Sequence, residues 1–168
     1  MHDELTAVDI QKMKEGLEYR SNVLRRKIIE DVQTARAFGD LSENFEYKAA
    51  KQEKRRNDSR IRYLERMIKT AHVIDGTVTD EGTVGLFDKV TIYMEEDDEE
   101  EVIQLVTTLR QNPLKGLISK ESPVGKAVLG HKIGDRVKVE VNADYSYYVE
   151  IRAIEKGQDD DSMEISRY

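Results

Sequence analysis

Apolar residues recur at helical spacing through the first part of the chain. Between about Val8 and Phe38 the steps are mainly three, four or seven, the period of an amphipathic helix: Ile10, Met13, Leu17, Leu24, Ile28, Val32 and Ala35. A second series alternates steps of three and four: Tyr47, Ala50, Lys54, Asn57, Ile61, Leu64, Ile68 and Ala71. This alternation predicts a coiled-coil seam. Its two polar members, Lys54 and Asn57, are expected to specify one pairing register at some cost in stability.

Only a few residues separate the two helical series. Gly39 directly follows the first series, where a left-handed helix C-cap is expected. So short a connection makes the helices antiparallel neighbours. Each helix of about 30 residues would be about 45 Å long. Residues 1–75 are therefore predicted to form a long antiparallel α-helical coiled-coil hairpin.

The later part of the chain changes to the alternation that is typical of β-strands. Four segments show it, at 85–94, 102–109, 136–141 and 145–154. Between them, Ser122 and Pro123 indicate a helix start and Gly130 its end. Residues 76–156 are therefore predicted to form a compact, mainly antiparallel sheet with one short helix. Residues 157–168 are predicted to be an acidic, flexible tail, and the fold class is α+β.

Composition excludes several kinds of site. The chain has no cysteine, which excludes disulfides, thiolate metal sites and cysteine nucleophiles. His2, His72 and His131 are dispersed without ligand spacing, so neither a zinc site nor a histidine-based triad is indicated. No run approaches the ~20 apolar residues of a membrane span, and no signal peptide is recognisable. We expect a cytoplasmic protein without a membrane partner.

Charge is distributed unevenly along the chain. Residues 1–75 hold 16 Lys/Arg and 14 Asp/Glu, a balance of +2, whereas residues 76–168 hold 11 and 20, a balance of −9. A basic strip follows the turn: Lys48, Lys51, Lys54, Arg55, Arg56, Arg60 and Arg62. It fits a nucleic-acid backbone, contacted without sequence preference, or simply a solvated helix face. The acidic run 95–101 is expected to be a solvated hairpin loop.

The turn itself carries two carboxylates, Asp40 and Glu43. At the tip of a hairpin they are placed to enter another molecule's active site. The segment also fits a capping box, in which Asp40 caps the following helix. Two carboxylates alone make a weak magnesium site, because Mg²⁺ prefers octahedral oxygen coordination and usually shares ligands with substrate phosphates. A partner would have to supply the other ligands. Tyr47 and Tyr63 are interpreted as packing residues.

Several segments together resemble the Gre family of bacterial transcript cleavage factors. They are Gly39-Asp40-Leu41-Ser42-Glu43-Asn44, Glu46-Tyr47, Ala49-Ala50, Ala71-His72-Val73-Ile74-Asp75 and the Ser-Pro segment 121–130. The resemblance implies a coiled coil inserted through the secondary channel of RNA polymerase and an FKBP-like domain docked at the channel rim. Phe45 stands where the family pattern has a small residue.

The resemblance also implies a function. In a backtracked polymerase, Asp40 and Glu43 would help to hold a second Mg²⁺ and orient the attacking water. The polymerase then cleaves its own transcript by two-metal hydrolysis. The protein is thus expected to be no enzyme itself, to bind no cofactor alone, and to be a monomeric, DNA-binding elongation factor whose partners are bacterial RNA polymerase and the 3′ end of backtracked RNA.

Further residues receive roles from the same resemblance. Leu41, Ser42, Asn44 and Tyr47 would support the tip. Arg36, Lys48, Lys51 and Arg55 would contact RNA. Glu121, Ser122 and Pro123 would contact the polymerase rim.

Two other functions remain open. A non-cleaving binder could occupy the same channel and inhibit or regulate the polymerase. A helical adaptor unrelated to transcription would have a merely capped tip and no polymerase affinity. A peptidyl-prolyl isomerase is less favoured, because the sequence shows no legible pocket.

Overall fold

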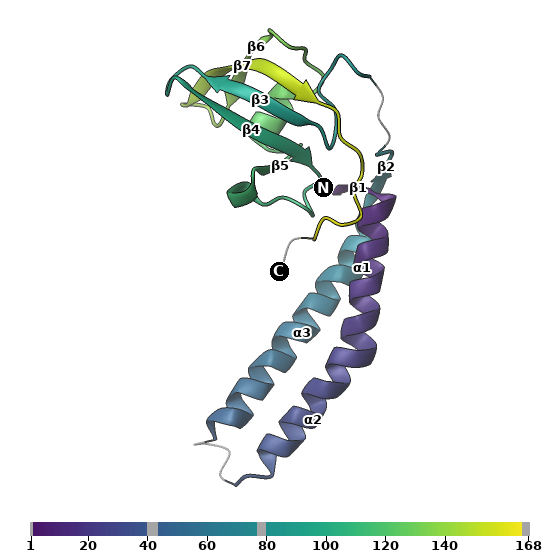
Figure 1. The fold of residues 1–168 in the computed structure, drawn as a ribbon. Coiled ribbons are helices and arrows are strands. Elements are labelled where there is room, and N and C mark those ends of the chain that lie inside the picture. Colours follow the sequence, from purple (N-terminus) through teal and green to yellow (C-terminus); the bar gives the residue numbers. More distant parts are fainter. Residues whose placement is uncertain (1, 40–43, 77–79, 166–168) are drawn as a thin grey trace. The chain divides into compact units, whose positions relative to one another are not determined.

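The computed structural model describes residues 2–39, 44–76 and 80–165, and the chain divides into two compact units (Figure 1). The helical unit spans Ile10–Ala71. The sheet unit contains Asp3–Asp9 together with the chain from His72 onward. This differs from the boundary predicted after residue 75, because both ends of the hairpin belong to the sheet unit. There, strand β1 (Glu4–Thr6) pairs in parallel with β2 (His72–Ile74).

The helical unit is the predicted antiparallel hairpin. A continuous helical run consists of α1 (Ala7–Tyr19), the π-helical turn η1 (Arg20–Leu24) and α2 (Arg25–Arg36), and α3 (Phe45–Thr70) returns beside it (Figure 1). The apolar spacing does not predict η1. The π-helical turn begins after Leu17 and ends at Leu24. The apolar series has a step of seven residues between these two leucines, so no position of the series inside the step reveals the irregular geometry.

Apolar side chains fill the interior of the helical unit, and the polar side chains of Asn57 and Arg60 are buried with them. The buried apolar residues include Met13, Ile28, Ala35, Ile61 and Leu64. Asn57, at 3% exposure, lies in the seam as predicted. Its Oδ1 accepts a hydrogen bond from Arg20 Nη1 at 3.0 Å, and its Nδ2 donates to the Arg20 carbonyl at 3.2 Å. These two bonds connect α3 to η1 and favour one register.

The seam prediction for Lys54 is wrong. Its side chain is 46% exposed, and its ammonium pairs with Asp58, one turn later on α3, at 3.2 Å. A lysine has a long, flexible side chain that can carry its charge to water, so burial without a counter-ion is avoided.

The sheet unit is built on five strands in the order β5-β4-β3-β7-β6. They are β3 (Lys89–Met94), β4 (Glu99–Val106), β5 (Leu117–Ser119), β6 (Arg136–Glu140) and β7 (Ser146–Glu155). All neighbours are antiparallel except β4 and β5, which run parallel. The register between β3 and β7 shifts at Thr91/Ile92. The four predicted strands are present with shifted ends, and the short β1, β2 and β5 are additional.

One helix packs on the sheet. It is α4 (Pro123–Val128), and its Val128 is buried with the core residues of the strands. Those residues alternate along each strand, as the sequence predicts: Val90, Ile92, Ile103, Leu105, Val137, Val139, Val149 and Ile151. The α+β class with a mainly antiparallel sheet is confirmed.

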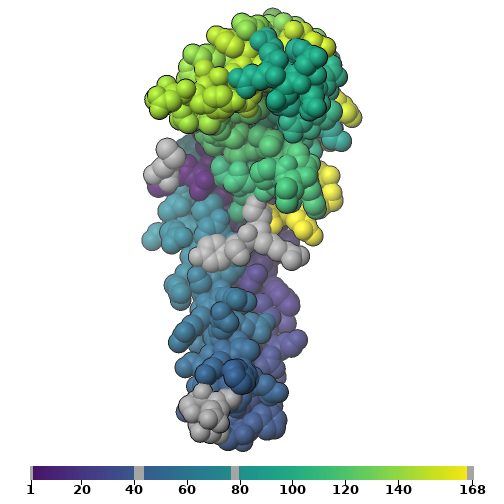
Figure 2. Space-filling model, turned by 90° about the vertical axis from the view of Figure 1, so that its left-hand side faces the viewer, coloured from purple at the N-terminus to yellow at the C-terminus, as the bar shows by residue number. Residues whose placement is uncertain are grey.

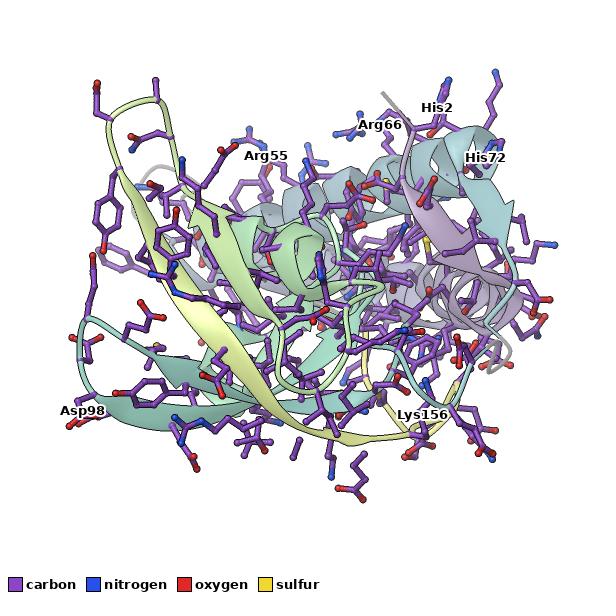
Figure 3. The ribbon with its side chains drawn as sticks, turned by 90° about the horizontal axis from the view of Figure 1, so that it is seen from above. His2, Arg55, Arg66, His72, Asp98 and Lys156 are labelled. Atoms are coloured by element: carbon purple, nitrogen blue, oxygen red, sulfur yellow. The ribbon has the colours of Figure 1, made fainter. Side chains whose placement is uncertain are left out.

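The acidic run is only partly a loop. Residues 95–98 form the turn between β3 and β4, and Glu99–Glu101 already belong to β4. Asp98, labelled in Figure 3, adopts a φ of 51°. Basic residues of the neighbouring strands pair with the run: Arg136 donates to both oxygens of Glu95 at 2.5 and 2.9 Å, and Arg152 donates to Glu100 at 3.2 Å. These pairs are exposed, so their contribution to stability is small.

Described residues of the segment after β7 form hydrogen bonds and an ion pair with the sheet unit, while the predicted flexibility of residues 157–168 stays a prediction. The Gly157 amide donates to Asp88 Oδ1 at 2.9 Å, next to Lys156, whose ammonium donates to Asp88 Oδ2 at 2.6 Å (Figure 3). Asp159 forms an ion pair with the buried Arg110. The sequence does not reveal these partners, because each lies at least 49 residues away along the chain.

Candidate functional site

The predicted tip residues Asp40, Leu41, Ser42 and Glu43 lie outside the described residues, so their roles remain predictions. The chain on both sides is described. α2 ends at Arg36, and Gly39 has a φ of 113°, a conformation that glycine adopts without strain. This agrees with the left-handed turn residue expected at Gly39.

Asn44 connects the two helix ends that flank the tip. Its Oδ1 accepts a hydrogen bond from the Tyr47 amide at 3.0 Å, which makes it the N-cap of α3. Its Nδ2 donates to the Ala35 carbonyl, in the last turn of α2, at 2.6 Å. One side chain therefore satisfies an orphan donor of one helix and an orphan acceptor of the other. Since α3 is capped by Asn44, its cap is not the Asp40 of the capping-box alternative.

Replacing Asn44 with alanine is expected to destabilise the hairpin by about 1–2 kcal/mol, because both hydrogen bonds are lost. Asn44→Asp keeps the cap but cannot donate to Ala35, so its loss should be intermediate. Urea unfolding followed by circular dichroism at 222 nm measures both variants. An Asn44→Asp protein as stable as the wild type would show that the bond to Ala35 contributes nothing.

Behind the tip, basic residues form a stripe on one face of α3. Lys48, Lys51, Arg55, Arg62 and Arg66 are exposed and recur at steps of three, four and seven, which keeps them on one side of a helix. We call this set the basic stripe. Figure 3 shows Arg55 and Arg66 on the same side of α3, and α3 forms much of the helical unit's surface in Figure 2.

Three of the four predicted RNA contacts belong to this stripe, Lys48, Lys51 and Arg55. The fourth, Arg36, is exposed at the end of α2. The ammonium of Lys51 lies 5.3 Å from the centre of the Tyr47 ring, so Tyr47 orients a stripe residue besides packing.

Two exposed aromatic rings flank the tip, and one of them, Phe45, is the residue that departs from the family pattern. Phe38 is 70% exposed and Phe45, the first residue of α3, is 81% exposed. The ammonium of Lys48 lies 5.7 Å from the centre of the Phe45 ring. The sequence contains a signal for this exposure. Phe45 is an apolar residue at the start of the second helix, but it does not belong to the apolar series of that helix.

In the sheet unit, the Ser-Pro segment forms the start of α4. Ser122 Oγ accepts from the Gly125 amide at 3.1 Å and donates to the Ser119 carbonyl at 2.6 Å. The hydroxyl is therefore used internally, and Pro123 and Glu121 are the exposed members of the predicted docking set. The prediction that Ser122 is an N-cap is confirmed.

Lys120 joins this segment to β1. Burial disfavours its charged form, but hydrogen bonds to Glu4 and Glu121 outweigh this and raise the pKa of Lys120. The same hydrogen bond from Lys120 lowers the pKa of Glu4. The segment next to Ser122 is thus held by a charged pair at neutral pH.

Gly125 is expected to be essential for the position of α4. A Cβ atom there would lie 2.2 Å from the Ser119 carbonyl oxygen and 2.9 Å from Lys120 Cα, both backbone atoms. Gly125→Ala should therefore cost about 1–3 kcal/mol or more of sheet-unit stability. Gly82→Ala is the control, since its Cβ would meet only Asp80 Oδ1 at 3.6 Å. Thermal unfolding compares the two, and equal melting temperatures would contradict the expectation.

Comparison with known proteins follows the division into two units. Residues 4–73 match the family described as "Transcription elongation factor, N-terminal", and residues 79–156 match "Transcription elongation factor, GreA/GreB, C-term". The chain belongs to the GreA/GreB family of transcription elongation factors. The predicted family resemblance is therefore confirmed.

Individual relatives of this GreA/GreB family member carry the name transcription elongation factor GreA. The protein from Mesoplasma florum is 38% identical over 151 residues, covering 89% of this chain and 96% of the relative. The one from Thermoanaerobacter pseudethanolicus is 44% identical over 139 residues, covering 83% and 88%. Among solved structures, the transcription factor Gfh1 is 25% identical with a TM-score of 0.46, covering 93% and 99%.

Two further findings concern membrane-spanning helices and metal-binding clusters. Within the described residues, no helix is both long and apolar enough to cross a membrane. The same residues contain no cluster of three or more histidine or carboxylate side chains that could hold a metal ion.

Proposed function

We propose that this elongation factor inserts its hairpin tip into the secondary channel of RNA polymerase and stimulates cleavage of the nascent RNA in backtracked complexes. The observation that carries the proposal is the double hydrogen bonding of Asn44, which joins the ends of α2 and α3, the two helices that the acidic segment connects in the sequence. Carboxylates that must reach into another protein's active site need such a rigid base.

Asp40 and Glu43 supply carboxylate oxygens, the ligand type that Mg²⁺ prefers. Two carboxylates do not complete the octahedral oxygen coordination that Mg²⁺ prefers, so the other ligands in this proposal come from the polymerase and from RNA phosphates. When bound, magnesium would activate water and stabilise charge on the scissile phosphate. The tip acids hold one side of the ion and orient the water, and the protein is not itself an enzyme.

In this proposal, the basic stripe and Arg36 form a positively charged surface that binds the extruded RNA. Phosphate contacts from Lys48, Lys51 and Arg55 require no particular base sequence, as expected for a factor that acts on any transcript. In the sheet unit, the exposed Glu121 and Pro123 would contact the channel rim, with Ser122 holding the segment in shape. The factor would act as a monomer in the cytoplasm.

A second candidate is favoured by Phe45. A large exposed ring at the first residue of α3 could fill space in the channel without assisting cleavage. The protein would then be a non-cleaving inhibitor or regulator of the polymerase.

The two functions are separated by RNA cleavage in stalled, backtracked complexes of the cognate polymerase with magnesium. Adding the protein should accelerate shortening of 3′-extruded transcripts, and chelation of magnesium should abolish the effect. Binding to the complex is measured in parallel. Bound protein that leaves cleavage unchanged or slowed would support the inhibitor, and absence of binding would contradict both functions.

A further inference from the structure

A cleft of about 560 Å³ lies on the helical unit beside η1. Arg20 of η1 lines one part of it, and the remaining lining comes from α3: Gln52, Arg55, Arg56, Ser59 and Arg60. We call it the arginine cleft. Four of its six residues are arginines and none is a carboxylate. Its volume is in the range of small-molecule sites.

Two of the four arginines are held in place by the protein. Arg20 is fixed by its reciprocal hydrogen bonds with Asn57, which is buried in the seam. Arg60 is only 6% exposed, and its guanidinium lies 4.8 Å from the centre of the Tyr63 ring. Positions that are fixed before a ligand arrives reduce the entropy lost on binding.

The other two arginines are exposed and adjustable. In the described part of the chain, neither Arg55 nor Arg56 forms an ion pair, and the nearby Asp58 is already bound by Lys54 at 3.2 Å and lies 3.6 Å from Arg25. An anion in the cleft would give Arg55 and Arg56 a counter-ion.

The position of η1 supports a binding role. Single π-helical turns within α-helices are frequent at functional sites. Here the turn places the Arg20 guanidinium against Asn57 on α3, at the edge of the cleft. Without Arg20, the cleft would be lined by α3 alone.

We propose that the arginine cleft binds two adjacent phosphate groups, as in a free nucleoside di- or triphosphate. Guanidinium groups form paired hydrogen bonds with phosphate oxygens. Arg20, Arg55 and Arg56 bring three positive charges to the cleft, which suit a multiply charged pyrophosphate group better than a single carboxylate. An RNA backbone also carries phosphates, but a sugar separates each from the next. The site does not depend on the tip acids or on the proposed cleavage.

Calorimetric titration of the full chain with inorganic pyrophosphate, and then with GDP, tests the proposal. One equivalent of each should bind. The variant Arg55→Gln/Arg56→Gln should bind about tenfold more weakly or worse, because charge-assisted hydrogen bonds are lost. The matched control, Lys14→Gln/Lys27→Gln, removes the same charge from exposed positions of the same hairpin and should retain the wild-type affinity.

The other outcomes each overturn the proposal. No binding to the wild type would exclude the site, and equal weakening in both double variants would show general charge attraction only. A titration with a short single-stranded RNA lacking a 5′ phosphate separates the two phosphate sources. If the RNA alone binds in an Arg55- and Arg56-dependent manner, the cleft serves a phosphodiester backbone. If the Arg55→Lys/Arg56→Lys variant retains full affinity for pyrophosphate, paired hydrogen bonds from guanidinium groups to phosphate oxygens are not the basis of binding.

Discussion

Replacing Arg110 with methionine is expected to lower the free energy of unfolding of the sheet unit by about 3–5 kcal/mol, the cost of removing one partner from a buried ion pair. The Arg110 side chain is fully buried. Its Nε lies 2.5 Å from Asp9 Oδ1, and its Nη2 lies 2.5 Å from Asp159 Oδ1. Methionine replaces the aliphatic part of the arginine side chain, but it leaves both carboxylates without their cation.

The loss should extend beyond the ion pair, because the network joins segments that are distant in sequence. Asp9 Oδ2 also accepts hydrogen bonds from the Thr107 hydroxyl at 2.8 Å and the Thr6 amide at 3.1 Å. The carbonyl of Asp160 accepts from Arg110 Nη1 at 3.3 Å. Without the arginine, both the first turn of α1 and the segment after β7 should be held less firmly.

Hydrogen exchange with mass spectrometry measures this effect, since it reports on β3 and β7 separately from the hairpin helices. Faster exchange is expected throughout the sheet unit. The control is Arg152→Met on β7, where the arginine side chain is 41% exposed and a surface ion pair contributes about 0–1 kcal/mol. If Arg110→Met exchanges no faster than this control, the buried network adds little to stability.

The hairpin was predictable because its signal repeats over many turns. Each of Ile28, Ala35, Ile61 and Leu64 agrees with the same helical period, so one irregular turn at η1 does not hide it. The helical period identifies which residues are expected in the seam, but it does not show whether each of their side chains is buried there. At Lys54 it conflicts with the cost of burying a charge, and the lysine is exposed.

The sheet unit was predictable where its strands are long. In β6, the buried Val137 and Val139 alternate with exposed charges, as a sheet with one solvated face requires. Strands of three residues, such as β1 and β5, are too short to show any alternation. The pairing of Arg110 with Asp9 could not be deduced either, because it joins residues 101 positions apart.

The candidate site was predictable in its residue types but not in its contacts. The sequence indicates the tip acids and the run of basic residues that follows the turn, because both are local patterns. The hydrogen bond from Asn44 to the Ala35 carbonyl depends on how two helix ends meet, which no local pattern specifies. The arginine cleft depends in the same way on Arg20, which lies in the π-helical turn and meets α3 at the cleft.

Asp40→Asn and Glu43→Gln are expected to reduce stimulated RNA cleavage by about two orders of magnitude each, while polymerase binding is retained. Each amide keeps the size of the side chain but loses the negative charge that a shared magnesium ion requires. A loss of about 3 kcal/mol of charge stabilisation corresponds to roughly 100-fold in rate.

Single-turnover cleavage in backtracked complexes, at saturating protein, measures the effect without a contribution from binding. Asp31→Asn is the matched control, because it removes one exposed carboxylate from α2 within the same hairpin, and it should cleave like the wild type. If the tip variants also behave like the wild type, the acids do not take part in the chemistry. A stimulation that survives both substitutions would have to arise from occupation of the channel, and the exposed Phe45 would then be the next residue to replace.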